Sequence, residues 1–149
     1  PGSPIQNSLE GRGVARVITG TAPVGGNEFN EVVPTGARWC VDSIEYMVPT
    51  GGLAGNRMLT VAYVQVSSGR ILMRSISPVL WPALSNAIGY WAAAVSQELV
   101  VNNIPPTCGI PLDMPLLAGT AIRSITDGLL AGDQPSSPLM SVREFLEAQ

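Results

Sequence analysis

Short β-prone segments separated by turn residues run through most of the chain, and this rhythm restricts its fold more than any other feature. Sixteen glycines and thirteen prolines divide the 149 residues, and Gly, Pro, Asn and Ser are the residues that end strands and form turns. Strands are expected at 14–19, 27–33, 38–48, 57–66, 71–77 and 120–127. Several short strands without a strong amphipathic helix predict an all-β fold, a single antiparallel β-sandwich, of which the jelly roll is one form.

The first dozen residues differ from the rest of the chain. Residues 1–12 are polar and rich in turn residues, with only Ile5 and Leu9 as apolar anchors. We expect an extended N-terminal arm, which either lies along a partner surface through these two residues or frays as an ordinary terminus. The sandwich domain is predicted for residues 13–149.

The stretch GNRMLTVAYVQVSSGRILMRS, residues 55–75, predicts two strands around a tight turn at Gly69. Because strand side chains alternate, Leu59, Val61 and Tyr63 should share one face. Both faces are nonetheless mostly apolar, whereas an antiparallel sheet in a small domain commonly leaves one face to water. Two explanations are open. Leu59, Val61 and Tyr63 could form an interface with sister subunits, or the second sheet and the loops of the same chain could cover both faces.

Two segments allow more than one structure. Residues 83–99 are rich in alanine but lack helical periodicity, so a strand is favoured over a helix. In residues 138–149, Ser141 and Glu144 have the spacing of a capping box and favour a helix, although residues 139–145 could equally form a terminal strand. The proline-containing segments between them are expected to form a loop at 102–109 and an edge strand or irregular path at 110–117.

The charge inventory narrows the possible partners. Only 13% of residues are charged, against about 25% in an average globular protein. The eight basic residues are all arginine and are scattered singly, so no basic patch for nucleic acid is visible. The apolar runs are far shorter than the roughly 20 residues of a membrane-spanning helix. We therefore expect neither nucleic acid nor a membrane as partner, and the low charge favours a homo-oligomer whose subunits cover one another's apolar surface.

No residue pattern indicates catalysis. The chain has no histidine, which removes the commonest general base and the commonest metal ligand. Asp42 and Glu45 are three residues apart on a predicted strand and should face opposite sides. Asp127 and Asp133 flank a turn without the spacing of a calcium loop. No serine lies in a G-x-S-x-G motif, and GGLAGN lacks the lysine of a phosphate loop. We predict a non-enzymatic protein without a cofactor or metal.

Cysteine and aromatic residues each have two interpretations. Without a visible signal peptide, Cys40 and Cys108 are expected to be reduced and buried, and a single disulfide is the alternative. The three tryptophans and Tyr90 could form a platform that stacks on sugar rings, but core packing is favoured. The tryptophans are Trp39, Trp81 and Trp91.

A family resemblance is carried by the stretches VPTGARWCVDSIEYMV, GNRMLTVAYVQVSSGRILMRS and IPLDMPLLAGTAIRSITDGLLAGDQ. Over roughly residues 32–134 their order resembles that of small tailed-phage virion proteins. Those proteins have a VPAG.RW opening, a GNR strand, an LP…LL.AG…IR segment and a GDQ motif that precede a final strand.

The resemblance implies a capsid-associated β-sandwich, similar to the decoration or cement proteins that stud phage heads. It implies assembly in the host cytoplasm, a place on the virion's capsid surface, the major capsid protein as partner and a homotrimeric state. It also implies that the last segment is a strand. A neck or tail-fibre component, and a carbohydrate-binding module for host attachment, are the alternatives.

Overall fold

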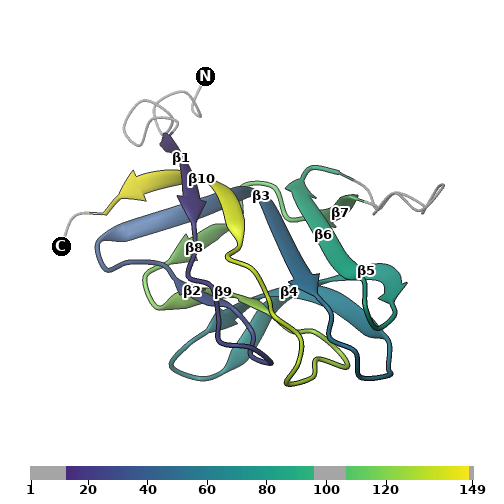
Figure 1. The fold of residues 1–149 in the computed structure, drawn as a ribbon. Helices are drawn as coiled ribbons and strands as arrows, with labels where there is room; N and C mark the ends of the chain where they lie inside the picture. The colour runs from purple at the N-terminus through teal and green to yellow at the C-terminus, as the bar shows by residue number, and fades with distance from the viewer. Residues whose placement is uncertain (1–12, 96–106, 148–149) are drawn as a thin grey trace.

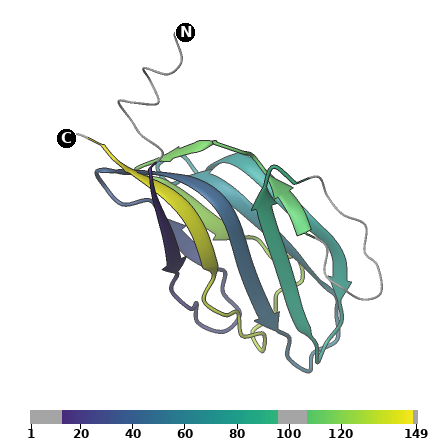
Figure 2. The ribbon, with the colours of Figure 1, turned by 90° about the horizontal axis from the view of Figure 1, so that it is seen from above.

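The computed structural model describes residues 13–95 and 107–147, and in these ranges it contains ten strands and no helix. The strands form two sheets that face each other across a common core (Figures 1 and 2). Accordingly, no helix able to cross a membrane is found in the described ranges. The predicted all-β sandwich is confirmed, whereas the predicted arm at 1–12, with Ile5 and Leu9, lies outside the described residues.

Each sheet has a simple strand order. The first sheet runs β1 (Val14–Thr19), β10 (Leu139–Leu146), β3 (Ala37–Pro49), β6 (Asn86–Ala93) and β7 (Thr107–Ile110), with β8 (Pro115–Leu117) also paired to β3. The second runs β2 (Asn30–Val32), β9 (Thr120–Ser124), β4 (Arg57–Gln65) and β5 (Arg70–Trp81).

Four antiparallel pairings are nested within one another and define the topology. The first strand pairs with the last, β1 with β10, and inside that pair lie β2 with β9, β3 with β6, and β4 with β5. The pairings of β10 with β3 and of β9 with β4 then join these ladders into the two sheets. This arrangement is the eight-stranded jelly roll. The short strands β7 and β8 are additions in the connection between β6 and β9.

Residues 139–146 form strand β10, although local sequence signals favour a helix in this segment. Met140 and Val142 are fully buried, whereas Leu139 is exposed and Ser141 between them is half-buried, which is the alternation of a strand. Glu144 does not cap a helix, because its carboxylate accepts a 2.9 Å hydrogen bond from Trp39 Nε1 and lies 2.6 Å from Arg16 Nε. Pairing with β1 on one side and β3 on the other stabilises the strand. Of the two structures left open for this segment, the terminal strand that the resemblance implies is the one that forms, and the helix that local signals favour does not.

The alanine-rich segment forms β6, as favoured, up to Ala93. Gly89 makes room on this strand for the Trp91 ring, which occupies the space where a Cβ at position 89 would lie. Trp91 is fully buried, and its Nε1 donates to the Ser75 carbonyl oxygen at 3.2 Å. The loop predicted at 102–109 is partly wrong, because Thr107–Ile110 forms β7, a parallel neighbour of β6.

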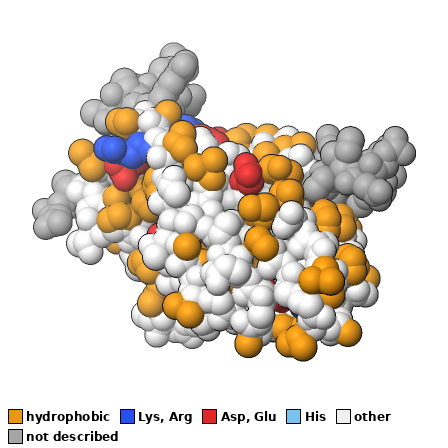
Figure 3. All heavy atoms as spheres, viewed as in Figure 1, with side chains coloured by type: hydrophobic (Ala, Val, Ile, Leu, Met, Phe, Trp, Pro, Cys, Tyr) orange, Lys and Arg blue, Asp and Glu red, His pale blue; other side chains and the backbone are white. Residues whose placement is uncertain are grey.

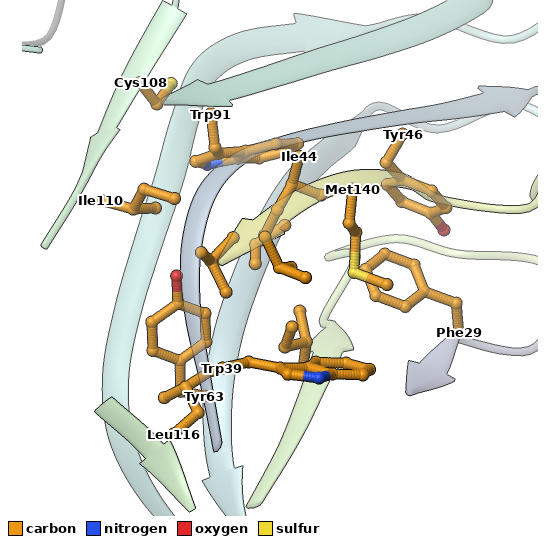
Figure 4. Close-up of a cluster of buried hydrophobic side chains, with 14 of the residues drawn as sticks. Phe29, Trp39, Ile44, Tyr46, Tyr63, Trp91, Cys108, Ile110, Leu116 and Met140 are labelled. Atoms are coloured by element: carbon orange, nitrogen blue, oxygen red, sulfur yellow. The ribbon is translucent and has the colours of Figure 1, made fainter. Parts of the chain in front are cut away.

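The core lies between the two sheets and is built from large aromatic and aliphatic side chains (Figure 4). Phe29 and Tyr46 pack edge to face, with ring centroids 4.8 Å apart. Leu59, Val61 and Tyr63 of β4 belong to this core.

The opposite face of β4 is also buried, although it does not belong to the main core. Thr60, Ala62 and Val64 are buried there, and each is paired on β5 with a larger residue, namely Ile76, Arg74 and Ile71. Ala62, for example, is flanked by Arg74 of β5 and Arg123 of β9. Residues of the same chain therefore bury both faces of β4, so the apolar pattern of β4 does not require a sister subunit, whereas Ile71 and Ile76 of β5 stay exposed.

Candidate interaction surfaces

The carboxylates considered for catalysis or metal binding do not form a site. Asp42 is paired with Arg143, at 3.2 Å, while Glu45 is exposed and makes no ion pair. Asp133 is fully buried, whereas Asp127 is exposed. Within residues 13–95 and 107–147, no group of three His, Cys, Asp or Glu side chains is arranged to hold a metal ion.

The interface predicted at Leu59, Val61 and Tyr63 is wrong. These side chains are 0%, 0% and 1% exposed, because they point into the space between the sheets. They cannot contact a partner in the folded chain. The other two predicted interface residues, Ile5 and Leu9, lie outside the described ranges.

The aromatic platform, the less favoured interpretation of the tryptophans and Tyr90, is not assembled either. Trp39 and Trp91 are buried in the core, and Trp81 packs partly against it. Only Tyr90 is appreciably exposed, on the outer face of the first sheet. Cys40 and Cys108 are buried and form no disulfide, and burial raises the pKa of both thiols.

The outer face of the first sheet carries a shallow depression of about 440 Å³. Its floor includes Ser43 and Ser141, which pair directly across β3 and β10. Leu139, Glu45 and Tyr90 also line it. This surface is weakly polar and nearly uncharged.

The outer face of the second sheet holds positive charge without a matching negative charge. Arg74 and Arg123 are exposed and make no ion pair within residues 13–95 and 107–147, and Arg123 Nε donates to Asn30 Oδ1 at 3.3 Å. Exposed Val32, Ile71 and Ile76 lie on the strands that carry these arginines or pair with them. This face is apolar and mildly basic.

A buried ion pair organises the loops at one end of the sandwich. Arg57 and Asp133 are both fully buried, and the Arg57 guanidinium binds the carboxylate through Nε and Nη2, each at 2.9 Å. The backbone N–H groups of Gly51 and Leu130 also donate to Asp133, at 2.8 and 2.9 Å. The remaining nitrogen, Arg57 Nη1, donates to the carbonyl oxygens of Leu53 and Gly55. The two residues belong to the GNR and GDQ motifs quoted above.

The hydrogen bonds to Asp133 also set its protonation. Burial alone would raise the pKa of this carboxyl group, but hydrogen bonds from Arg57, Gly51 and Leu130 outweigh it and hold the pKa below its usual value. Asp133 is therefore ionised at neutral pH, and both charges of the pair are satisfied.

Hydrogen bonds and close packing hold three loops, 20–29, 50–56 and 82–85, around this ion pair. Thr50 Oγ1 donates to the carbonyl oxygens of Pro82 and Ser85 at 3.0 Å, which ties loop 82–85 to loop 50–56. Gly51 packs so closely on Gly132 that a Cβ would lie 2.8 Å from its carbonyl oxygen. In loop 20–29, Gly26 N–H donates to the Asp133 carbonyl oxygen at 2.8 Å. These loops lie together along the lower edge of the view in Figure 1.

Three of these loops present an aliphatic side chain to solvent. Val24, Leu53 and Leu84 are 78%, 59% and 82% exposed, and we call them together the apolar loop end. Figure 3 shows hydrophobic side chains along this lower edge, while charged ones gather near β1. The sequence analysis missed this surface. The available signal is a lone aliphatic residue between turn residues, as in APVGG, GGLAG and WPALS.

Comparison with known proteins gives a distant structural likeness. No family model and no curated protein matches the sequence. Among solved structures, a chain from the crystal structure of an icosahedral viral particle, that of IBDV, matches with a TM-score of 0.41 and 14% identity. The alignment covers 93% of this chain and 32% of that chain, so the present chain spans about a third of its match.

Proposed function

We propose that the protein is a non-enzymatic structural component of a phage virion, an oligomeric decoration or cement protein, trimeric by resemblance, that binds the major capsid protein on the head surface. The observation that carries the proposal is the exterior of the jelly roll. Large hydrophobic side chains are exposed on its loops, on its edge strand and on sheet faces, and few charges lie between them. Apolar surface of this extent is typical of a protein that works by covering another.

Two further observations support this proposal. The sequence resembles small tailed-phage virion proteins, and the jelly roll is an architecture used by viral capsid and lectin domains. Reinforcing a shell needs no catalytic group, since each copy stabilises it by burying apolar area between neighbouring subunits. Such burial contributes about 25 cal/mol per Å², less the cost of association.

The sugar-binding alternative is less well supported by the side chains. Two of the four aromatic residues that would form its platform are core residues. A place in the neck or tail predicts a different stoichiometry, because those structures hold one small ring of subunits per particle.

Particles prepared without the protein provide the test. Purified protein should bind their heads, reach a copy number set by the repeating shell lattice, and raise the temperature at which the heads release DNA. Binding confined to one vertex or to tails would overturn the head assignment. No binding to any part of the particle would overturn the virion role.

A further inference from the structure

We propose that the apolar loop end, Val24, Leu53 and Leu84, is the surface that docks on the shell. The inferred partner site is an apolar depression on the shell protein, bordered by a basic side chain. This inference rests on the proposed function and specifies which surface performs it.

Exposure is the first argument. Val24 and Leu84 are among the most exposed large hydrophobic side chains in the described residues, at 78% and 82%. Each stands alone on a loop tip, where neither sheet covers it. A single exposed aliphatic residue needs no explanation, but here three loops that are hydrogen-bonded or packed together at one end of the sandwich each present one.

Hydrogen bonds hold the loops that carry Leu53 and Leu84 in place before any partner binds. The Leu53 carbonyl oxygen accepts a 3.1 Å hydrogen bond from Arg57, so the buried ion pair holds this loop directly. The Leu84 N–H donates to the Gly51 carbonyl oxygen at 3.2 Å, and Thr50 fixes the ends of the same short loop. Loops held in this way lose little conformational entropy on binding, which raises affinity for a given contact area.

The backbone conformation of Leu84 supports the proposal independently of the exposure of its side chain. Its φ is +54°, in the left-handed region that glycine and asparagine occupy at low cost and a leucine does not. Folding alone would favour Gly or Asn at this position. A leucine that is both strained and exposed gives the isolated chain no packing gain, so its side chain is best explained by a contact with a partner.

The charged residues near the apolar loop end favour a protein partner over a lipid surface. Arg57, which is fully buried, is the only basic residue in loops 20–29, 50–57, 82–85 and 125–138. Next to Arg57, Asp127 is exposed, makes no ion pair with another described residue and bridges to Met58 through its backbone. Loops that enter anionic membranes combine apolar tips with Lys or Arg. A lone carboxylate instead complements a basic side chain on a protein.

The test compares variants of the full-length protein for binding to particles prepared without it. The triple variant Val24→Ser, Leu53→Ser, Leu84→Asn should bind at least tenfold more weakly. Leu84→Asn alone should also weaken binding while its melting temperature stays equal or rises, because asparagine accepts the left-handed backbone. A role in folding would instead lower the melting temperature. Asp127→Asn should weaken binding a few-fold at low salt and reduce its salt dependence.

Matched controls are available at the other end of the sandwich and at the chain end of β10. Leu117→Ser and Leu146→Asn change side chains that are 57% and 84% exposed, and both variants should bind as the unchanged protein does. A folded triple variant with full shell binding would overturn this inference and leave the proposed function standing, whereas an unchanged protein that never binds particles would overturn both. Binding to phosphatidylserine vesicles that is lost in the triple variant would mean that the apolar loop end docks on lipid and not on a shell protein.

Discussion

At the scale of single residues, the Arg57–Asp133 pair is the arrangement most sensitive to change. Both side chains are fully buried, and every nitrogen of the guanidinium group has an acceptor. Asp133→Asn should therefore lower the free energy of unfolding by about 3–5 kcal/mol, because it leaves the arginine charge buried and unpaired. Urea unfolding followed by tryptophan fluorescence measures this loss.

An exposed ion pair supplies the matched control. Asp113 pairs with Arg143 at the surface, where the aspartate side chain is 61% exposed. Asp113→Asn should change the free energy of unfolding by no more than about 1 kcal/mol. Equal losses in the two variants would mean that burial does not strengthen the Arg57–Asp133 pair.

The lowered pKa of Asp133 predicts a pH dependence with a definite sign. Above its usual pKa of 3.8, the carboxyl group is ionised in both the folded and the unfolded chain, so the stabilisation is fully present. As the pH falls below that value toward the lower folded-state pKa, the unfolded chain binds the proton first and the stabilisation is lost. The difference in unfolding free energy between the unchanged protein and Asp133→Asn should therefore shrink as the pH falls below 3.8. A difference that is constant over this range would contradict the assigned pKa shift.

At the scale of elements, β10 shows how tertiary pairing overrides a local signal. Ser141→Ala should cost about 1 kcal/mol if Ser141 capped a helix, but close to nothing on the outer face of a strand. Met140→Ala should cost about 2–5 kcal/mol, because the methionine is fully buried. Thermal or urea unfolding of the two variants distinguishes the structures, and a larger loss for Ser141→Ala would contradict the strand.

Strand β6 depends on the absence of a side chain at one position. Gly89→Ala should destabilise the domain by about 1–3 kcal/mol, since the new methyl group displaces the buried Trp91 ring. Gly52→Ala makes the same chemical change where the nearest contact is a leucine methyl group at 3.8 Å, so its stability should be unchanged or slightly higher. Near-ultraviolet circular dichroism of the tryptophans reports the displacement directly.

Sequence patterns predicted the strands with strong local signals and missed those made by distant pairing. The boundaries of β1 and the turn at Gly69 follow from alternation and turn residues close together in the chain. In contrast, β7 lies in a proline-bounded segment and exists because it pairs with β6. The face assignment of Leu59, Val61 and Tyr63 was right, but alternation cannot tell an inner face from an outer one when both are apolar.

At the scale of the whole molecule, the candidate site arises from loops that are far apart in the chain. Val24, Leu53 and Leu84 come to the same end of the molecule because the nested jelly-roll pairing brings loops 20–29, 50–56 and 82–85 together there. The GNR and GDQ motifs were visible in the sequence, but their meeting as an ion pair was not. The amino-acid composition indicated that the protein exposes apolar surface with little charge, and the strand topology determines where this surface lies.

The oligomeric state of the protein determines how tightly the apolar loop end can bind a shell. Three aliphatic side chains per subunit bury little area, so a single copy should bind a shell weakly, whereas a trimer presents three loop ends at a high effective concentration. The exposed apolar side chains and low charge favour such an oligomer. Sedimentation at micromolar concentration should therefore give a mass about three times that of the 15.6 kDa chain. A protein that sediments as a monomer and still binds particles tightly would contradict the multivalent mechanism and require a much larger contact for each copy.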